Sequence, residues 1–489
     1  MKLEESSQLN RRRFLSALGA AVLLGSAGCS GDDDTEETPP QTTPTETPPP
    51  TTPTETPVST PDPTSSPSPS PTPSDDGQAT PTESPDRTTD PWGDIEPTGK
   101  PQYTDDPNWR MVGHDLGNTS CNPHAEGPSD DPSIQWVLET SLYPSINNYT
   151  FHHPLIVDDT VYTTIPFQRI RDNEEIERWK FVAADAATGE TETVFTVDDW
   201  LRKPTIVDGT VYVAVGWTVR AYDLASGEER WRTDPSPDAE PNLYNISTIR
   251  YVDGVVIVTD NNRLNDSDGN PVPQHYGFDG DTGNMLWKAV GDGKEADGPQ
   301  IPLIVDGLSL YPRTPTLRDI ETGAERVTLP KRLRSPSIHD GELYGVDEGE
   351  ENVLVSLDWE TLDERWTLRS DKRIHAASVM SFDDVLVAGA GEGFLGIDRE
   401  TGAEVWYTEP ADGWDDVDSH LGSVFRPSTQ ETVYAVHYGG AVTALDPTDG
   451  SIEWQLKTDE MDWSIITGCA LAEDLLVTVA KKGKMFAIS

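Results

Sequence analysis

Two parts of this 489-residue chain have polar side chains at spacings that could bind a metal ion or support catalysis. The run Asn265-Asp266-Ser267-Asp268-Gly269-Asn270 resembles a calcium-binding loop. An EF-hand alignment would put Leu264 and His275 at the first and twelfth ligand positions, where neither coordinates calcium properly. A polar hairpin connection is the favoured interpretation. His114 and Asp115 are adjacent, but no nucleophile stands at a matching spacing, so we expect them to cap their segment.

The three cysteines raise a separate question of chemistry. Cys29 follows a short apolar run, whereas Cys121 and Cys469 lie far apart in the sequence. Outside the cytoplasm these two could form a disulfide. Cys121 lies just before a strand that we expect to close onto the unit containing Cys469. Two separate buried thiols are the alternative.

A phrase of the form Ala-x-Asp-x-x-Thr-Gly-x-x-x-Trp recurs along the chain. Its aspartates stand at positions 185, 223, 279, 319, 358, 398 and 446, a period of about 40 residues. Glycine permits the positive φ of a turn, and aspartate is expected to bond nearby amides there rather than a metal. In two copies Thr193 and Val327 replace the tryptophan, which predicts looser packing, and Leu362 replaces the glycine of another. The characteristic tryptophans and glycines are Trp136, Trp231, Trp287, Trp366, Trp406, Trp454, Gly227, Gly283, Gly402 and Gly450.

A second phrase precedes most copies of the first. In Pro204–Val213, alternating β-branched residues flank Asp208-Gly209, the pattern of a β-hairpin. Each unit is therefore four antiparallel strands, which describes a propeller blade. The last unit stops at Ser489 without its outer strand, and residues 133–138 supply a Trp-bearing strand without a hairpin. Pairing the two predicts an all-β, eight-bladed β-propeller closed by strands from both termini. Related hairpins centre on Asp158-Asp159, Asp253-Gly254, Asp306-Gly307, Asp340-Gly341, Asp383-Asp384 and Glu473-Asp474.

The repeated phrase resembles the tryptophan-docking motif of the pyrroloquinoline-quinone-like (PQQ-like) propellers, and the likeness covers residues 107–489. Trp109-Arg110-Met111-x-Gly113-His114-Asp115 also resembles the first segment of such domains. The family includes quinoprotein dehydrogenases and non-catalytic BamB-like proteins. The resemblance implies that the tryptophans pack between neighbouring blades near the rim. They are expected to be structural docking residues rather than a ligand cage.

Quinoprotein dehydrogenases hold PQQ over a calcium ion, and many carry two adjacent cysteines. No two cysteines here are adjacent, and we find neither a cofactor-sandwiching tryptophan nor a calcium ligand set in the sequence. We therefore expect no cofactor and no catalytic residue. A PQQ- and calcium-dependent dehydrogenase that oxidises alcohols or sugars stays as the alternative.

Composition limits the partners and the environment. Acidic residues outnumber basic ones by 86 to 36, for a formal charge of −50. Such self-repulsion weakens a compact state at low salt, and molar salt screens it. We expect a protein of an extreme halophile of the haloarchaeal type. Without a basic stripe, nucleic acid is not an expected partner.

The first hundred residues predict export. Arg11 and Arg12, followed by Phe14-Leu15 and an apolar run, resemble a twin-arginine signal, and Ala27-Gly28-Cys29 resembles a lipobox that would be lipidated at Cys29. The predicted domains are a signal peptide (1–29), a disordered Thr/Pro/Ser/Asp-rich linker (30–100) and the propeller (101–489). The protein would be anchored on the outer face of the cytoplasmic membrane. Four sequons, at Asn118, Asn148, Asn245 and Asn265, could carry N-linked glycans.

Propellers bind their partners through the loops that share one face. Here these loops carry aromatic and histidine residues, which interfaces favour. We expect a monomeric, non-catalytic module that binds cell-envelope proteins. A surface propeller that binds glycans or solutes is a second alternative. The candidate binding residues are Tyr143, His152, His153, Tyr244, Trp414, His420 and Trp463.

Overall fold

A computed structural model describes the propeller and part of the segment that precedes it. The described residues are 90–139, 153–171, 174–235, 246–265, 271–290, 301–375, 379–391, 393–409, 427–436, 441–457, 466–480 and 484–489. They belong to one compact unit, Ser84–Ser489. Every named element is a β-strand, and no helix within this part of the chain could span a bilayer.

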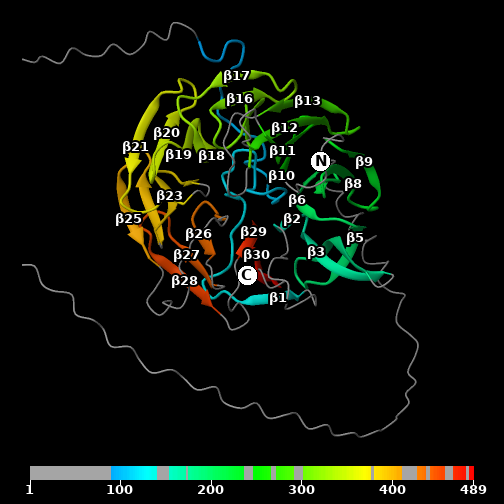
Figure 1. Cartoon of the computed structure of the whole chain (residues 1–489). Coiled ribbons are helices and arrows are strands. Elements are labelled where there is room, and N and C mark those ends of the chain that lie inside the picture. The colour runs from blue at the N-terminus through cyan, green and yellow to red at the C-terminus, as the bar shows by residue number, and fades with distance from the viewer. Residues whose placement is uncertain are drawn as a thin grey trace, which may run out of the picture. The chain divides into compact units, whose positions relative to one another are not determined.

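Eight small sheets stand around a common centre, each a blade whose first strand is innermost (Figure 1). Four blades come from the first half of the propeller, and their strands follow one another in chain order. Blade 1 holds β2 (Leu155–Val157), β3 (Thr160–Arg171), β4 (Glu174–Asp185) and β5 (Thr191–Val197); blade 2 holds β6 (Leu201–Val207), β7 (Thr210–Val215), β8 (Thr218–Asp223) and β9 (Glu229–Thr233); blade 3 holds β10 (Ile246–Val252), β11 (Val255–Asn265), β12 (Pro271–Asp279) and β13 (Met285–Val290); blade 4 holds β14 (Leu303–Val305), β15 (Leu308–Leu310), β16 (Thr316–Asp319) and β17 (Glu325–Thr328).

The second half completes the ring. Blade 7 has three named strands, and its innermost position is occupied by Ser428, which bridges to Val433. Blade 8 ends with β1 as its outer strand, so both parts of the chain close the ring, as predicted. Blade 5 holds β18 (Leu333–His339), β19 (Glu342–Asp347), β20 (Val353–Asp358) and β21 (Glu364–Arg369); blade 6 holds β22 (Met380–Ser381), β23 (Val385–Ala390), β24 (Gly393–Asp398) and β25 (Glu404–Thr408); blade 7 holds β26 (Val433–Val436), β27 (Ala441–Leu445) and β28 (Ile452–Lys457); blade 8 holds β29 (Ile466–Ala472), β30 (Leu475–Ala480), β31 (Lys484–Ile488) and β1 (Ile134–Glu139).

The predicted hairpins join the first and second strands of the blades. At the Asp208-Gly209 turn, Val207 pairs with Thr210, and both turn residues have positive φ. Positive φ at both central positions is the geometry of the tight turn that suits strand twist. Leu264 of β11 pairs with Val272 of β12, so the strands that flank the run resembling a calcium loop form a hairpin, as expected; residues 266–270 of that run lie outside the described residues.

The tryptophans of the repeat lie between blades. Trp231 of blade 2 donates its indole N–H to Gly280 O of blade 3 at 2.8 Å, and its ring lies against Gly283. A Cβ at Gly283 would stand 2.4 Å from that ring, so the turn needs a residue without a side chain. Trp136, Trp287, Trp366 and Trp406 repeat this arrangement against Gly189, Gly323, Gly402 and Gly450. Trp454 is buried and packs near Tyr434.

The two interfaces that lack the tryptophan are filled by other side chains. Between blades 1 and 2, Phe195 stacks on Tyr222 with ring centroids 3.9 Å apart. Between blades 4 and 5, Val327 and Leu362 belong to one buried cluster, and Leu362 adopts φ +60° at the turn.

Trp92 supplies an indole to the same cluster. It is 4% exposed, packs on Trp359, and donates to Glu360 O at 2.6 Å. The prediction that the disordered linker extends to residue 100 is therefore wrong for residues 90–100. The composition of this stretch is polar, but the buried Trp92 indole and the hydrogen bonds from Thr98 and Gly99 to Asp306 hold it against the blades.

Candidate functional site

The propeller has two ends that differ in how the strands are joined. The first-to-second and third-to-fourth strand turns lie together at one end, the turn end, because the strands of a blade are antiparallel. The connections between blades leave from the other end, the connection end. At the turn end, strands are joined by short β-turns of the same length, as at Asp208-Gly209 and Asp253-Gly254. At the connection end, the interblade connections differ in length, from the short one at residues 198–200 to the long one at residues 140–154.

The predicted binding residues belong to the interblade connections. Of these residues only His153 is described; it is 6% exposed and lies against Gly468 of blade 8. The others lie outside the described residues: Tyr143, His152, Tyr244, Trp414, His420 and Trp463.

Residues 92–108, the strap, cross the turn end. Thr98 and Gly99 donate their backbone N–H groups to Asp306 Oδ2 at 2.8 and 2.9 Å. Gln102 donates to Asp253 Oδ2 at 2.9 Å, and Asn108 Oδ1 accepts from the N–H of Asp158 at 2.9 Å. The acidic turn residues of blades 4, 3 and 1 are thus tied by one segment.

Residues 109–122, the axial segment, then run back across the centre of the ring (Figure 1). They pair with the exposed backbone edges of the innermost strands. The carbonyls of Arg110, Leu116 and Gly117 accept from the N–H groups of Ile206, Ile304 and Ile338 at 3.0, 2.8 and 3.1 Å. Trp109 and Ile156 exchange two hydrogen bonds, and Ser428 bonds to Ser120 and Asn122. This segment therefore joins blades 1, 2, 4, 5 and 7.

His114 and Asp115 hold the axial segment in shape. Both are fully buried, and Asp115 Oδ1 accepts from the N–H groups of Gly117 and Thr119 at 2.8 and 3.2 Å. His114 Nε2 lies 3.0 Å from Asp106 O. These contacts fit the expected capping role. Asn118 is 4% exposed and bonds to Pro336 O, so a buried amide rather than a glycan occupies that sequon.

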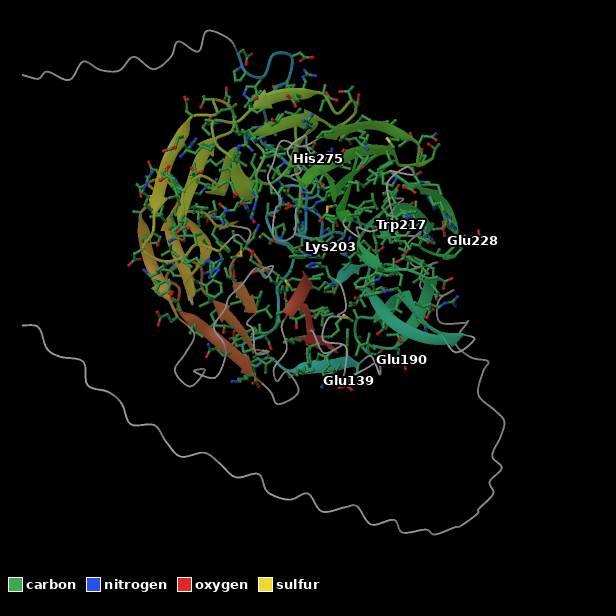
Figure 2. All side chains as sticks on the ribbon, viewed as in Figure 1. Glu139, Glu190, Lys203, Trp217, Glu228 and His275 are labelled. Carbon is green, nitrogen blue, oxygen red and sulfur yellow. The ribbon has the colours of Figure 1, made fainter. Side chains whose placement is uncertain are left out.

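Three basic side chains gather near the centre, beside the axial segment. Arg250 on β10 is fully buried and donates one N–H to Asn118 Oδ1, while its Nε and Nη1 have no hydrogen-bond partner within the described part of the chain. Lys203 and Arg202 lie on β6 of the neighbouring blade. Figure 2 shows Lys203 near the centre of the ring and Glu139, Glu190 and Glu228 toward its outer edge.

The environment of this basic group disfavours its charges. Burial, then the nearby guanidinium groups of Arg202 and Arg250, lower the pKa of Lys203 to about 7. Burial lowers the pKa of Arg250 to about 10, against the opposite effect of Asp115. Burial also lowers the pKa of Arg202. Burial therefore disfavours the charged forms of all three groups, and the two guanidinium groups further disfavour that of Lys203, in a chain of strongly acidic composition.

Sequence reasoning missed this basic group. The available signal was the pair Arg202-Lys203 at the start of an innermost strand, in a chain poor in basic residues. Arg250 carried no such signal, because a single arginine in a strand is usually a surface residue.

A second buried group lies between blades 3 and 4. His275 on β12 is 2% exposed, and its ring stacks on Tyr311 with centroids 3.4 Å apart. Burial, aided by the charge of Arg318, lowers the pKa of His275 to about 3, so the imidazole is neutral at physiological pH. We interpret His275 as a residue that packs between the blades rather than as part of a site.

The described cysteines and acidic groups do not form the sites considered above. Cys121 and Cys469 are both thiols, so the structure does not contain the disulfide that was considered. Cys121 Sγ lies 3.3 Å from Thr429 O, and burial raises the pKa of its thiol to about 11. No three His, Cys, Asp or Glu side chains of the described residues come together as metal ligands.

Solved structures with the same fold include BamB and several dehydrogenases. BamB from Moraxella catarrhalis matches with a TM-score of 0.51 and 14% identity, over 73% of this chain and 97% of that one. Quinohemoprotein alcohol dehydrogenase from Comamonas testosteroni matches with a TM-score of 0.55 and 12% identity, over 79% and 81%. A europium-containing methanol dehydrogenase matches with a TM-score of 0.51 and 11% identity, over 79% and 99%. At these identities the likeness shows the fold alone.

Comparison of the sequence with protein families gives a more specific result. No curated protein matches the chain. The family described as outer membrane protein assembly factor BamB matches residues 151–297 and 276–489, which together span most of the propeller. The chain is thus a PQQ-like propeller and belongs to the family of the outer membrane protein assembly factor BamB.

Proposed function

We propose that this protein is a non-catalytic, cell-surface propeller that binds proteins of the envelope through its connection end. The observation that carries the proposal is the difference between the two ends. At the turn end, the strap and the axial segment bond to the turns and to the innermost strands. The connection end carries interblade connections of unequal length, the usual place for recognition on a rigid scaffold.

Export and anchoring complete the proposal. Arg11 and Arg12 would direct export, and lipidated Cys29 would hold the protein on the outer face of the cytoplasmic membrane. Membership of the BamB family agrees with protein binding at a cell envelope. Assembly of an outer membrane is not part of the proposal, because a haloarchaeal type of envelope would have no outer membrane.

A pull-down with matched variants tests the binding face. The purified chain would be incubated with solubilised envelope proteins in molar salt. We expect Trp414→Ser combined with Trp463→Ser to lower partner recovery roughly tenfold, because aromatic residues dominate interface energies. Leu286→Ser, at a side chain 48% exposed on the outer strand β13, is the control and should leave recovery unchanged. Equal recovery from the folded double variant would reject this face.

The main rival is a quinoprotein dehydrogenase, and its support is the fold shared with quinohemoprotein alcohol dehydrogenase. Titration with PQQ and calcium, followed by quinone absorbance and thermal shift, separates the two. We expect no stoichiometric signal from the folded chain. A calcium-dependent, saturable signal would overturn the proposal in favour of an oxidoreductase.

A propeller that binds glycans or solutes is the remaining rival. In that case the aromatic residues of the connection end would stack on sugar rings. Envelope proteins stripped of glycans would then no longer be recovered by the chain, whereas a protein-binding module would still recover them.

A further inference from the structure

Arg250 poses a problem of hydrogen bonding that the propeller fold alone does not solve. Its side chain is fully buried, and one of its nitrogens donates to Asn118 Oδ1. The other two, Nε and Nη1, are buried and have no hydrogen-bond partner among the residues that the structure describes. A guanidinium is always charged in proteins, and a buried charged donor without an acceptor is strongly destabilising.

Two further basic side chains lie near Arg250, and repulsion between positive charges acts on one of them, Lys203. Lys203 and Arg202, on the innermost strand of the next blade, are close enough for Lys203 to feel the charge of both arginines. Asp115 is the acidic group whose charge acts on Arg250. Its carboxylate already accepts hydrogen bonds from Gly117 and from both the N–H and the hydroxyl of Thr119.

A bound anion would remove both difficulties at once. An oxyanion has several acceptor oxygens, so it can accept from donors that approach from different strands. Its negative charge would also offset the repulsion that Arg202 and Arg250 exert on Lys203. A water molecule could satisfy an N–H group but not the charge.

We propose that Arg250, Lys203 and Arg202 form a binding site for a small oxyanion at the centre of the propeller. In this site Arg250 donates from Nε and Nη1, and the protonated amine of Lys203 and the guanidinium of Arg202 contribute from β6. The occupant is a free ion of the sulfate, phosphate or carboxylate type. The site does not depend on what binds at the connection end.

Sulfate is the probe, because its charge does not change between pH 5 and pH 9. The purified full chain would be titrated with sulfate by isothermal calorimetry, at constant ionic strength set with potassium chloride. We expect one sulfate per chain. Arg250→Gln and Lys203→Gln should each weaken binding by roughly tenfold or more, because each removes a charge-assisted hydrogen bond.

The control is Arg232→Gln. Arg232 is an exposed arginine of the outer strand β9, in the same blade as Lys203, and it pairs with Glu229. This variant should bind sulfate with the affinity of the parent chain. If Arg250→Gln does not fold, Lys203→Gln decides the question, because Lys203 is only partly buried.

Two results would overturn the proposal. One is the absence of saturable sulfate binding by the folded parent chain. The other is equal sulfate affinity of the parent chain and folded Lys203→Gln, which would place the ion elsewhere.

Discussion

At the turn end of this propeller, one N-terminal stretch contacts the turns and then pairs with the innermost strands of five blades. At the connection end, the interblade connections differ in length and sequence from blade to blade. Repeated hydrogen bonding favours a fixed structure, and unequal connections favour recognition. Under the proposed function, this fold keeps stability and binding at opposite ends, so each should be open to disturbance without the other.

The largest expected effect comes from removing an anchor of the axial segment. Trp109 is 1% exposed, exchanges two backbone hydrogen bonds with Ile156, and packs edge-on against His114. Trp109→Ala should lower the free energy of unfolding by about 3–5 kcal/mol. The measurement is chemical denaturation in molar salt.

Trp217 gives the matched comparison at the other end. It stands between β7 and β8 with 36% of its surface exposed. Trp217→Ala should cost less than about 1.5 kcal/mol. If Trp109→Ala and Trp217→Ala lowered the free energy of unfolding by similar amounts, the two ends would not differ in their contribution to stability.

The next effect separates turn strain from blade packing. Gly283 and Gly209 both have positive φ, but a Cβ at Gly283 meets the Trp231 ring at 2.4 Å, whereas one at Gly209 meets nothing within 4 Å. Gly283→Ala should cost about 3 kcal/mol and Gly209→Ala only about 1 kcal/mol. Thermal unfolding of the two variants measures the difference. Equal costs would mean that the indole contact adds nothing.

A smaller effect is expected at the interface that lacks its own tryptophan. Trp92→Ala should lower the free energy of unfolding by about 2 kcal/mol, because it removes a buried indole from the Val327–Leu362 cluster. Truncation of the chain before residue 90 is the control and should leave this stability unchanged. A Trp92→Ala variant as stable as the parent would show that the strap is not held by this residue.

The smallest effect concerns Lys203 and pH. Burial lowers its folded-state pKa to about 7, whereas an unfolded lysine titrates near about 10.4. Between these values the unfolded state binds more protons, so stability rises with pH through this group, and the cost of charging it is fully present below pH 7. In sulfate-free buffer, Lys203→Met should therefore exceed the parent in stability by about 1 kcal/mol at pH 6.

That advantage should shrink as the pH rises toward 10. The measurement is the free energy of unfolding of both chains, determined by chemical denaturation at several pH values between 6 and 10. A constant difference between Lys203→Met and the parent would show that the amine is solvated in the folded state.

The sequence predicted the repeating parts of the fold well. A turn such as Asp208-Gly209 and a motif such as that ending at Trp231 are local patterns, and local patterns survive in the folded state. The closure of the eighth blade could also be predicted, because the last unit of the repeat, which ends at Ser489, lacked its outer strand and residues 133–138 supplied one.

The features that sequence reasoning missed all depend on contacts between distant residues. Trp92 meets Trp359, and Arg250 meets Asn118, across separations that no local pattern encodes. Leu362 illustrates the same limit. It breaks the turn rule locally, yet it packs in the cluster where Val327 replaces the tryptophan. The candidate site could be predicted only as a class of surface, because interblade connections carry no repeat.

Photo-crosslinking in cells tests the central claim most directly. A photoreactive residue would replace Trp414 or Trp463 at the connection end, or Asp208 or Asp253 at the turn end. The account predicts crosslinks to envelope proteins from the first pair and none from the second. Crosslinks from the turn end, or none from the connection end of a folded and exported chain, would contradict it.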